Sequence, residues 1–424
     1  MVYKHFKKFY LTLPSIVLLL CAASAVKAEF TLTPRITTGI SYTDNVFLDD
    51  EEVEDSVFTM VSPGFDAALS GRKAALEISY NPTYTAINPY PEYNLWGHEG
   101  SLNAWVEIAR GARIELNESY SKSSDPVSET DTTVRHGRSP HAANSAKLAL
   151  INEFGPEDKF ELRYEHQSLE NDDPTVEDSA RHNPGALFTW WFSPARYAIE
   201  IEGSGTISDF DRRENFEALD ARMRLTKRFG RHVDAYLEYS HSATDFLEDG
   251  MDYHVYNPTA GIIWKMDADT EFSVGFGYFY RDEENGDSDD GIAGSVEMRR
   301  DWTERGSLTL KGDMGYDRAY FGAENLGFNP YSEVSGSITQ QLGRRITGSV
   351  TAGFRNTKYI DEEPDREDTR TRAGGSLTFQ ALPWMVFQID YEYRRLDSSV
   401  DRNDYEENRG TFTISLTARK PLRL

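Results

Sequence analysis

Residues 219–239 decide the fold. Before the glycine at position 230 the chain reads Leu219-Asp220-Ala221-Arg222-Met223-Arg224-Leu225, and after it Val233-Asp234-Ala235-Tyr236-Leu237-Glu238-Tyr239. Apolar and polar residues alternate in both runs. This two-residue period is typical of a β-strand with one apolar face and one polar face. Two such strands around a short turn predict an antiparallel hairpin.

The same pattern recurs along the chain, because turn-forming residues return at intervals of 36 to 44 residues. These turn-formers are Gly71, Gly111, Gly155, Pro194, Gly230, residues 267–269, Gly306, Gly343 and Pro383. Long polar connections lie between them, most of them acidic, at 44–55, 123–140, 170–180, 283–291 and 361–368. Two strands in each unit predict about twenty strands, with about eighteen as the alternative count.

A strand with one apolar face needs a cover, and three features indicate that lipid supplies it. The alternating runs are long enough to cross a bilayer at a tilt, short turns alternate with long loops, and aromatic residues gather near strand ends. The aromatic residues are Tyr80, Tyr84, Trp190, Trp191, Phe192, Tyr278, Phe279, Tyr280, Trp384, Tyr391 and Tyr393. We therefore predict an all-β, transmembrane, antiparallel up-and-down barrel. A soluble β-propeller has a similar period, but no Gly-His or Trp-Asp pair recurs.

The N-terminus predicts export. Lys4, Lys7 and Lys8 precede a mostly apolar run, and small residues lead to a cleavage site between Ala28 and Glu29. We interpret residues 1–28 as a signal peptide, with a membrane anchor as the alternative, and residues 29–424 as a single barrel domain. The predicted location is the bacterial outer membrane.

Composition excludes several functions. Asp and Glu number 70 against 45 Lys and Arg, a formal net charge of −25, so nucleic acid would be repelled. The chain has no His-Glu-x-x-His motif, phosphate loop or dinucleotide fingerprint, and its histidines form no recognisable triad. The acidic segment 285–291 lacks the glycine and the closing glutamate of an EF-hand. We therefore expect no enzyme, no cofactor and no bound metal.

Two stretches carry a family resemblance. The first runs through Tyr42-Thr43-Asp44-Asn45-Val46-Phe47-Leu48 to Val61-Ser62-Pro63-Gly64, and the second is Asn408-Arg409-Gly410-Thr411-Phe412-Thr413-Ile414. The chain resembles the outer-membrane β-barrel porins of type 2, which are often associated with exopolysaccharide loci. The resemblance implies an outer-membrane location and a barrel architecture.

If the apolar face meets lipid, the alternate residues line an enclosed pore. The candidates are Glu161, Arg163, Glu165, Arg222, Arg224, Asp234, Glu238, Asp390, Glu392 and Arg394. Two interpretations stay open: a ladder of salt bridges that stiffens the wall, or a polar track for a charged solute or a glycan. The longest connection, 123–140, is hypothesised to fold inward and narrow the pore.

The predicted function is a porin-like channel for polar solutes or the exit pore of an exopolysaccharide. The alternative is a structural or adhesive barrel with acidic surface loops and no open pore. Expected partners are outer-membrane lipid and lipopolysaccharide, the barrel-assembly machinery and, for an exit pore, a polysaccharide or its export proteins.

Overall fold

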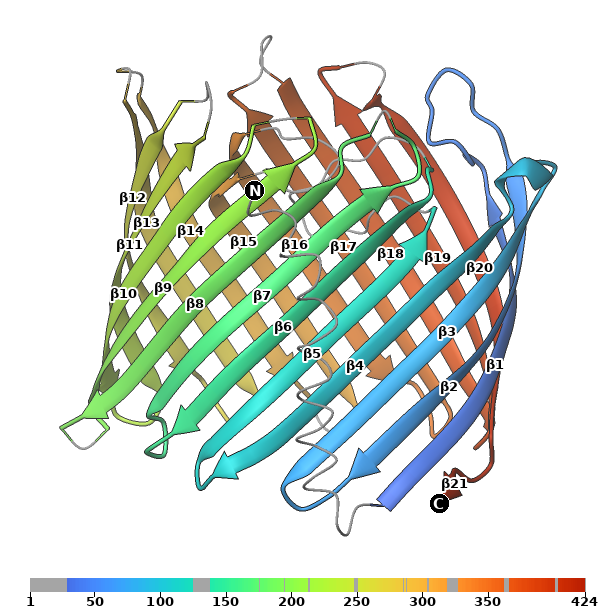
Figure 1. The fold of residues 1–424 in the computed structure, drawn as a ribbon, viewed down its shortest axis with the longest axis horizontal. Coiled ribbons are helices and arrows are strands. Elements are labelled where there is room, and N and C mark those ends of the chain that lie inside the picture. Colours follow the sequence, from blue (N-terminus) through green and yellow to red (C-terminus); the bar gives the residue numbers. More distant parts are fainter. Residues whose placement is uncertain are drawn as a thin grey trace, which may run out of the picture.

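The computed structural model describes residues 29–424, apart from 125–137, 175, 194, 213, 248–250, 285, 287, 303–304, 319–326, 362–365, 401–402 and 424. Within these residues, twenty long antiparallel strands form one closed barrel (Figure 1). The predicted signal peptide, including Ala28, lies outside the described residues, whereas Glu29 begins the first strand.

The strands follow one another around the barrel in chain order. They are β1 (Glu29–Thr43), β2 (Ser56–Ser70), β3 (Ala74–Asn88), β4 (Leu95–Ala109), β5 (Ala112–Ser123), β6 (His141–Glu153), β7 (Lys159–Asn171), β8 (Ser179–Phe192), β9 (Tyr197–Phe210), β10 (Phe216–Phe229), β11 (Val233–Phe246), β12 (Tyr253–Lys265), β13 (Thr270–Glu283), β14 (Ser288–Asp301), β15 (Gly306–Arg318), β16 (Phe328–Gln341), β17 (Ile346–Tyr359), β18 (Arg366–Leu382), β19 (Met385–Ser398), β20 (Tyr405–Thr417) and the short β21 (Leu422–Arg423). A 3-10 turn, η1 (Pro91–Tyr93), precedes β4. No helix among the described residues is long and apolar enough to cross a membrane.

The barrel closes where β20 pairs with β1. Their register runs from Arg35 opposite Thr417 to Thr43 opposite Arg409. β21 adds a short pairing of Leu422 with Leu32 near the start of β1. Closure leaves no open sheet edge, which is the condition for a sheet to lie in lipid. The prediction of an up-and-down barrel of about twenty strands is confirmed.

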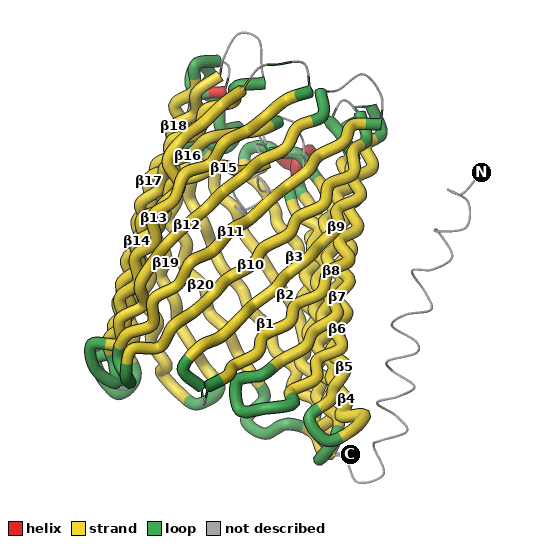
Figure 2. The backbone as a smooth tube through the Cα atoms, turned by 90° about the vertical axis from the view of Figure 1, so that its left-hand side faces the viewer, coloured by secondary structure: helices red, strands yellow, loops and turns green. Residues whose placement is uncertain are grey.

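Short turns gather at one rim and longer connections at the other (Figure 2). Gly111 and Gly230 lie in short turns with φ of 79° and 75°, values that favour glycine. The predicted turn residue Pro194 lies outside the described residues. One predicted loop was too long: β14 already begins at Ser288, because Asp289 and Asp290 pair with β13. Segment 283–291 is therefore a short connection followed by strand.

The alternation of the sequence becomes an outer face and an inner face. Leu219 on β10 and Leu237 on β11 are 63% and 64% exposed, and Leu225 lies directly opposite Leu237. Arg222 and Arg224 alternate with these residues along β10 and turn to the inside. The outer face is thus apolar and uncovered by protein, as a lipid-facing wall requires.

The predicted aromatic band needs two corrections. Trp190 is exposed on the outer face, but Trp191 turns inward, where the guanidinium of Arg228 stacks 4.0 Å from its ring. Phe279 likewise points inward and is only 2% exposed. Consecutive residues of a strand point to opposite faces, so a run of three aromatics cannot lie entirely in a membrane interface.

We predict that the closing seam tolerates no side chain at position 39. A Cβ on Gly39 would lie 2.9 Å from the backbone oxygen of Phe412. Gly39→Val should therefore destabilise the barrel by about 1–3 kcal/mol through overpacking. The measurement is the temperature at which the folded, faster-migrating band disappears on a gel.

The matched control is Gly410→Val, because a Cβ on Gly410, in the partner strand of the same seam, meets nothing within 4 Å. Equal loss of the folded band in both variants would contradict the account of the seam.

Candidate functional site

The inner face of the barrel holds all ten predicted pore-lining residues. They alternate along their strands with residues of the outer face, as Asp234 and Glu238 do with the exposed Leu237 and Tyr239. Seven belong to β7, β10 and β11, and three belong to β19. β9 lies in the middle of the strands that carry the first group, and β19 is ten strands away from β9 in either direction around the ring. The structure therefore does not bring the two groups together.

Arg222 is the centre of the first group. Its guanidinium donates to Glu200 and Glu202 on β9, at 2.6 Å each, and to Glu238 on β11 at 2.9 Å. Arg224 donates to the same Glu238 at 2.7 Å. One half-buried cation therefore joins three neighbouring strands, in an environment where charge-assisted bonds are stronger than on an open surface.

Arg163 extends this network from β7 to Glu202 on β9, across the intervening strand β8. The crossing is possible because β8 carries Gly185 at that point. A Cβ on Gly185 would lie 3.0 Å from Nε of Arg163. The absence of a side chain on β8 thus gives the arginine its path along the wall.

The other acidic candidates of this wall also have partners. Lys159 lies 2.5 Å from Glu161, and Gln167 donates to Glu165 at 2.7 Å. Arg228 donates to Asp234 at 3.2 Å and to Glu157, in the turn before β7, at 2.9 Å. The hydrogen bond from Arg228 lowers the pKa of Glu157. These contacts support the interpretation of this wall as a ladder of salt bridges that stiffens the barrel. We call the inner face of β7 to β11 the ladder wall.

On the opposite side of the barrel, β19 presents Asp390, Glu392 and Arg394. Gln388 donates to Asp390 at 2.8 Å, and Arg394 donates to Glu392 at 2.9 Å. Arg394 also lies 3.6 Å from Glu407 on β20. This wall pairs its charges mostly within one strand or with the next.

The rim of long loops is narrowed by a hairpin that bends inward. Pairing of β14 with β15 stops at Gly294 opposite Met314, although both strands continue beyond that point. The adjoining ends of β15 and β16, which we call the hairpin tip, carry Tyr316 and Phe328, whose rings lie 5.1 Å and 5.9 Å from the inward-facing Phe279. These two residues therefore pack against the inside of the wall.

Arg281 on β13 fixes this tip in place. It donates to Asp361, in the connection after β17, at 2.7 Å, and its guanidinium stacks 4.4 Å from the ring of Tyr253. Asp361 also accepts from the backbone N–H of Phe328 at 2.8 Å. One carboxylate thus joins the hairpin tip to the wall, and we call this group the mouth clamp (Arg281, Asp361 and Phe328).

A cavity of about 490 Å³ lies beside the mouth clamp. Its lining includes Arg224 and Glu238 from the ladder wall and Asp313 and Tyr331 from β15 and β16. The phenol of Tyr331 donates to Asp313. Polar groups of β10 and β11 on one side and of β15 and β16 on the other therefore line a cavity inside the barrel that is large enough to hold water molecules.

Arg138 approaches the lumen from the connection between β5 and β6. It donates to Glu407 on β20 and, at 2.8 Å, to the backbone oxygen of Val46. Burial lowers the pKa of Arg138 to about 10, so the side chain remains protonated at neutral pH. The hypothesis that connection 123–140 folds inward concerns mostly residues 125–137, which lie outside the described part of the chain.

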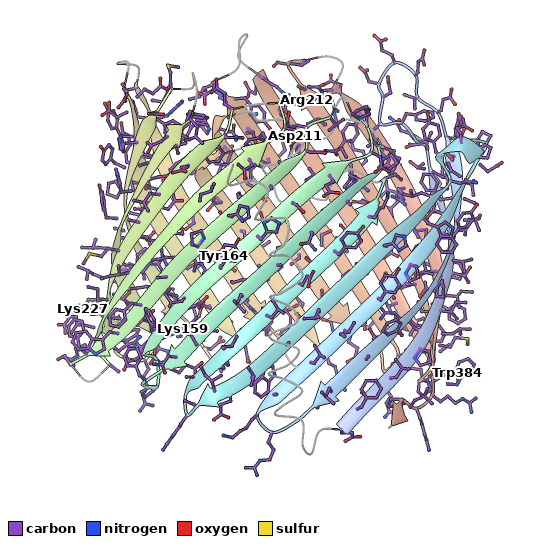
Figure 3. The ribbon with its side chains drawn as sticks, in the orientation of Figure 1. Lys159, Tyr164, Asp211, Arg212, Lys227 and Trp384 are labelled. Atoms are coloured by element: carbon purple, nitrogen blue, oxygen red, sulfur yellow. The ribbon has the colours of Figure 1, made fainter. Side chains whose placement is uncertain are left out.

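Most of the histidines that the structure describes lie on the outer face, away from the lumenal carboxylates. The rings of His166 and His182 are tilted by 33° with 4.7 Å between centroids, and the hydroxyl of Tyr164 is hydrogen-bonded to His182 at 2.7 Å (Figure 3 labels Tyr164). Within the described part of the chain, no three His, Cys, Asp or Glu side chains are grouped so as to hold a metal ion.

Sequence reasoning missed the inward aromatic cluster at the mouth. Its members include Phe210, Phe216, Tyr253, Phe279 and Phe328, all nearly fully buried. A signal was present, since Phe210 ends β9, Phe216 begins β10 and Tyr253 begins β12, each in the polar phase of its strand and beside a long connection. An apolar residue in that phase near a loop indicates packing inside the barrel.

Comparisons with known proteins agree with this architecture. Residues 301–418, which contain β15 to β20, match the sequence model of a family described as "Putative beta-barrel porin 2". This match confirms the resemblance seen in the sequence. No curated protein matches the chain.

Solved structures share the fold at very low identity. The FrpB iron transporter from Neisseria meningitidis superposes with a TM-score of 0.55 at 8% identity, covering 95% of this chain and 84% of that one. The siderophore receptor PirA from Acinetobacter baumannii gives 0.51 at 9%, with 93% and 81% covered. A BenF-like porin from Pseudomonas fluorescens gives 0.45 at 9%, with 93% and 100% covered. At these identities the likeness shows the fold alone.

The closed sheet, its apolar outer face and its charged interior define a porin-like barrel of the outer-membrane type. Within that class, the C-terminal strands are similar to the porin family named above.

We predict that Arg222 stabilises the ladder wall. Arg222→Met should lower the unfolding free energy by about 1–3 kcal/mol, because Glu200, Glu202 and Glu238 lose their shared cation. The measurement is chemical or thermal unfolding of the detergent-solubilised barrel.

The control is Arg395→Met, which breaks an exposed pair with Asp397 and should cost at most a fraction of that. A ladder variant no less stable than this control would argue against the stiffening role.

Proposed function

We propose that the chain is an outer-membrane channel that passes polar solutes by diffusion. The observation that carries the proposal is the interior: a closed ring of twenty strands whose inner face is lined by charged and hydroxyl side chains around solvent-accessible space. A solute that loses part of its hydration can regain hydrogen bonds from such a wall. Passage of an exopolysaccharide is the finer version of this proposal, supported by the family resemblance alone.

The mouth clamp gives the channel its selectivity for size. The hairpin tip and Asp361 occupy part of the lumen at the rim of long loops, opposite the rim that holds Lys159, Lys227 and Trp384 (Figure 3). Loops that enter a wide barrel restrict access without closing it, provided that polar space remains beside them. The cavity next to the clamp is such a space.

The second candidate is a structural or adhesive barrel without an open pore. The observation that favours it is the packing at the mouth, because the inward aromatic cluster fills space that a wide pore would leave to water. The connection after β1 also presents exposed acidic residues to a partner. In it, the N–H groups of Glu52 and Glu51 donate to Asp49 and lower its pKa, so this carboxylate stays ionised at neutral pH.

The deciding experiment is electrical recording of the purified protein in planar bilayers. We expect discrete, stable conductance steps, since the hydrated lumen carries ions. Heat-modifiable migration in gels shows that the inserted sample is folded. A folded sample that produces no steps would reject the channel and support the structural barrel.

We further predict that loosening the mouth clamp widens the path. Asp361→Asn weakens the bond to Arg281 and the bond from the N–H of Phe328, so single-channel conductance should rise or become noisier. Asp397→Asn, which removes an exposed carboxylate on β19, is the matched control and should behave like the unmodified protein. An unchanged conductance in the Asp361 variant would show that the hairpin tip does not limit the current.

A further inference from the structure

The inner wall formed by β17 to β20 differs from the ladder wall. On the ladder wall, Arg163, Arg222 and Arg224 each meet glutamates of other strands. On the β17–β20 wall, arginines lie directly opposite arginines: Arg355 on β17 faces Arg370 on β18, and Arg372 on β18 faces Arg394 on β19. Like charges directly opposite each other destabilise a sheet unless something else neutralises them.

The carboxylates that pair with the two outer arginines lie toward the edges of this wall. Arg355 is paired toward β15 and β16, with Asp317 and with Glu333 at 3.1 Å. Arg394 is paired with Glu392 on its own strand and with Glu407 on β20. These carboxylates hold the two outer members of the row. On β18 itself, Asp368 is paired with Arg366 at 2.8 Å.

Arg370 occupies that middle position. Its side chain forms no hydrogen bond or ion pair with any residue that the structure describes, and it is only partly exposed inside the barrel. Arg372 follows two residues later on the same face. Among the described residues, Arg370 therefore places a positive charge on this wall that no carboxylate within ion-pair distance neutralises.

Below the arginines, toward the rim of short turns, the same wall is lined by small hydroxyl side chains. They include Thr347, Ser349 and Thr351 on β17, Ser376 and Thr378 on β18, and Thr411, Thr413 and Ser415 on β20. Ser349 and Ser376 share a hydrogen bond of 2.7 Å, as do Thr37 and Ser415 at 2.9 Å. Short side chains leave the lumen open along this side and present donors and acceptors that suit hydroxyl groups.

We infer that Arg355, Arg370, Arg372 and Arg394, together with the hydroxyl band below them, form a binding subsite for polyhydroxylated solutes that carry carboxylates. A guanidinium offers two parallel N–H donors that match a carboxylate, and the hydroxyl band matches the rest of an acidic sugar. The inference deepens the proposed channel and rests on it for its role in transport. Binding itself can be measured without conductance.

The test uses two oligosaccharides of equal length, trigalacturonate and the neutral maltotriose. Binding to the folded, detergent-solubilised protein is measured by calorimetry, and block of the current is measured in bilayers. We expect trigalacturonate to bind and block at concentrations at least about tenfold lower than maltotriose, the effect of one charge-assisted contact. Arg370→Gln combined with Arg372→Gln should abolish that difference, and Arg370→Lys should restore only part of it.

The matched control is Lys311→Gln, which removes a lumenal cation on β15, outside the arginine row. It should leave the preference for trigalacturonate unchanged. Equal affinity for both oligosaccharides, loss of preference in the control, or inorganic phosphate binding as tightly as trigalacturonate would each overturn the subsite. Selective binding by a folded protein that shows no conductance would keep the subsite and reject the channel, so the two failures are distinguishable.

Discussion

The whole structure depends on satisfying backbone hydrogen bonds where no water is present. Each unpaired N–H or C=O in the hydrocarbon layer costs several kcal/mol, so a sheet in lipid must have no edge. In this chain the condition is met only when β20 pairs with β1, which joins the two ends of the described sequence. The inner face of the seam carries mostly small residues, with Ser41 and Thr411 sharing a hydrogen bond of 2.8 Å across it.

Once the ring is closed, the period of two assigns every side chain to lipid or to the lumen. The outer face can be uniformly apolar, but the inner face must place charges in a confined space of reduced dielectric. Two solutions appear on opposite sides of the barrel. Around Arg222 the charges neutralise one another across strands, whereas Arg370 on β18 lies directly opposite another arginine, Arg355. The first arrangement is suited to rigidity and the second to binding.

The sequence predicted what depends on neighbours along the chain. The turns, the strand count and the inward placement of residues such as Arg163 and Glu238 follow from alternation, which needs no knowledge of distant contacts. Alternation also places Trp191 and Phe279 on the inner face, although their position beside other aromatic residues predicted a membrane interface. The bond of Arg138 to Glu407 joins residues 269 positions apart, and local periodicity carries no information on such a contact.

Net charge describes the surface of this protein better than its interior. At physiological salt, a charge acts over about 8 Å, so the exposed acids of the loops do not determine the potential along β18. Inside the barrel, screening is weaker, and the nearest side chains dominate. An acidic chain can therefore hold a local wall that attracts anions. Glu392 and Glu407 neutralise one end of the row, so the proposed subsite would attract an anion most strongly near its middle.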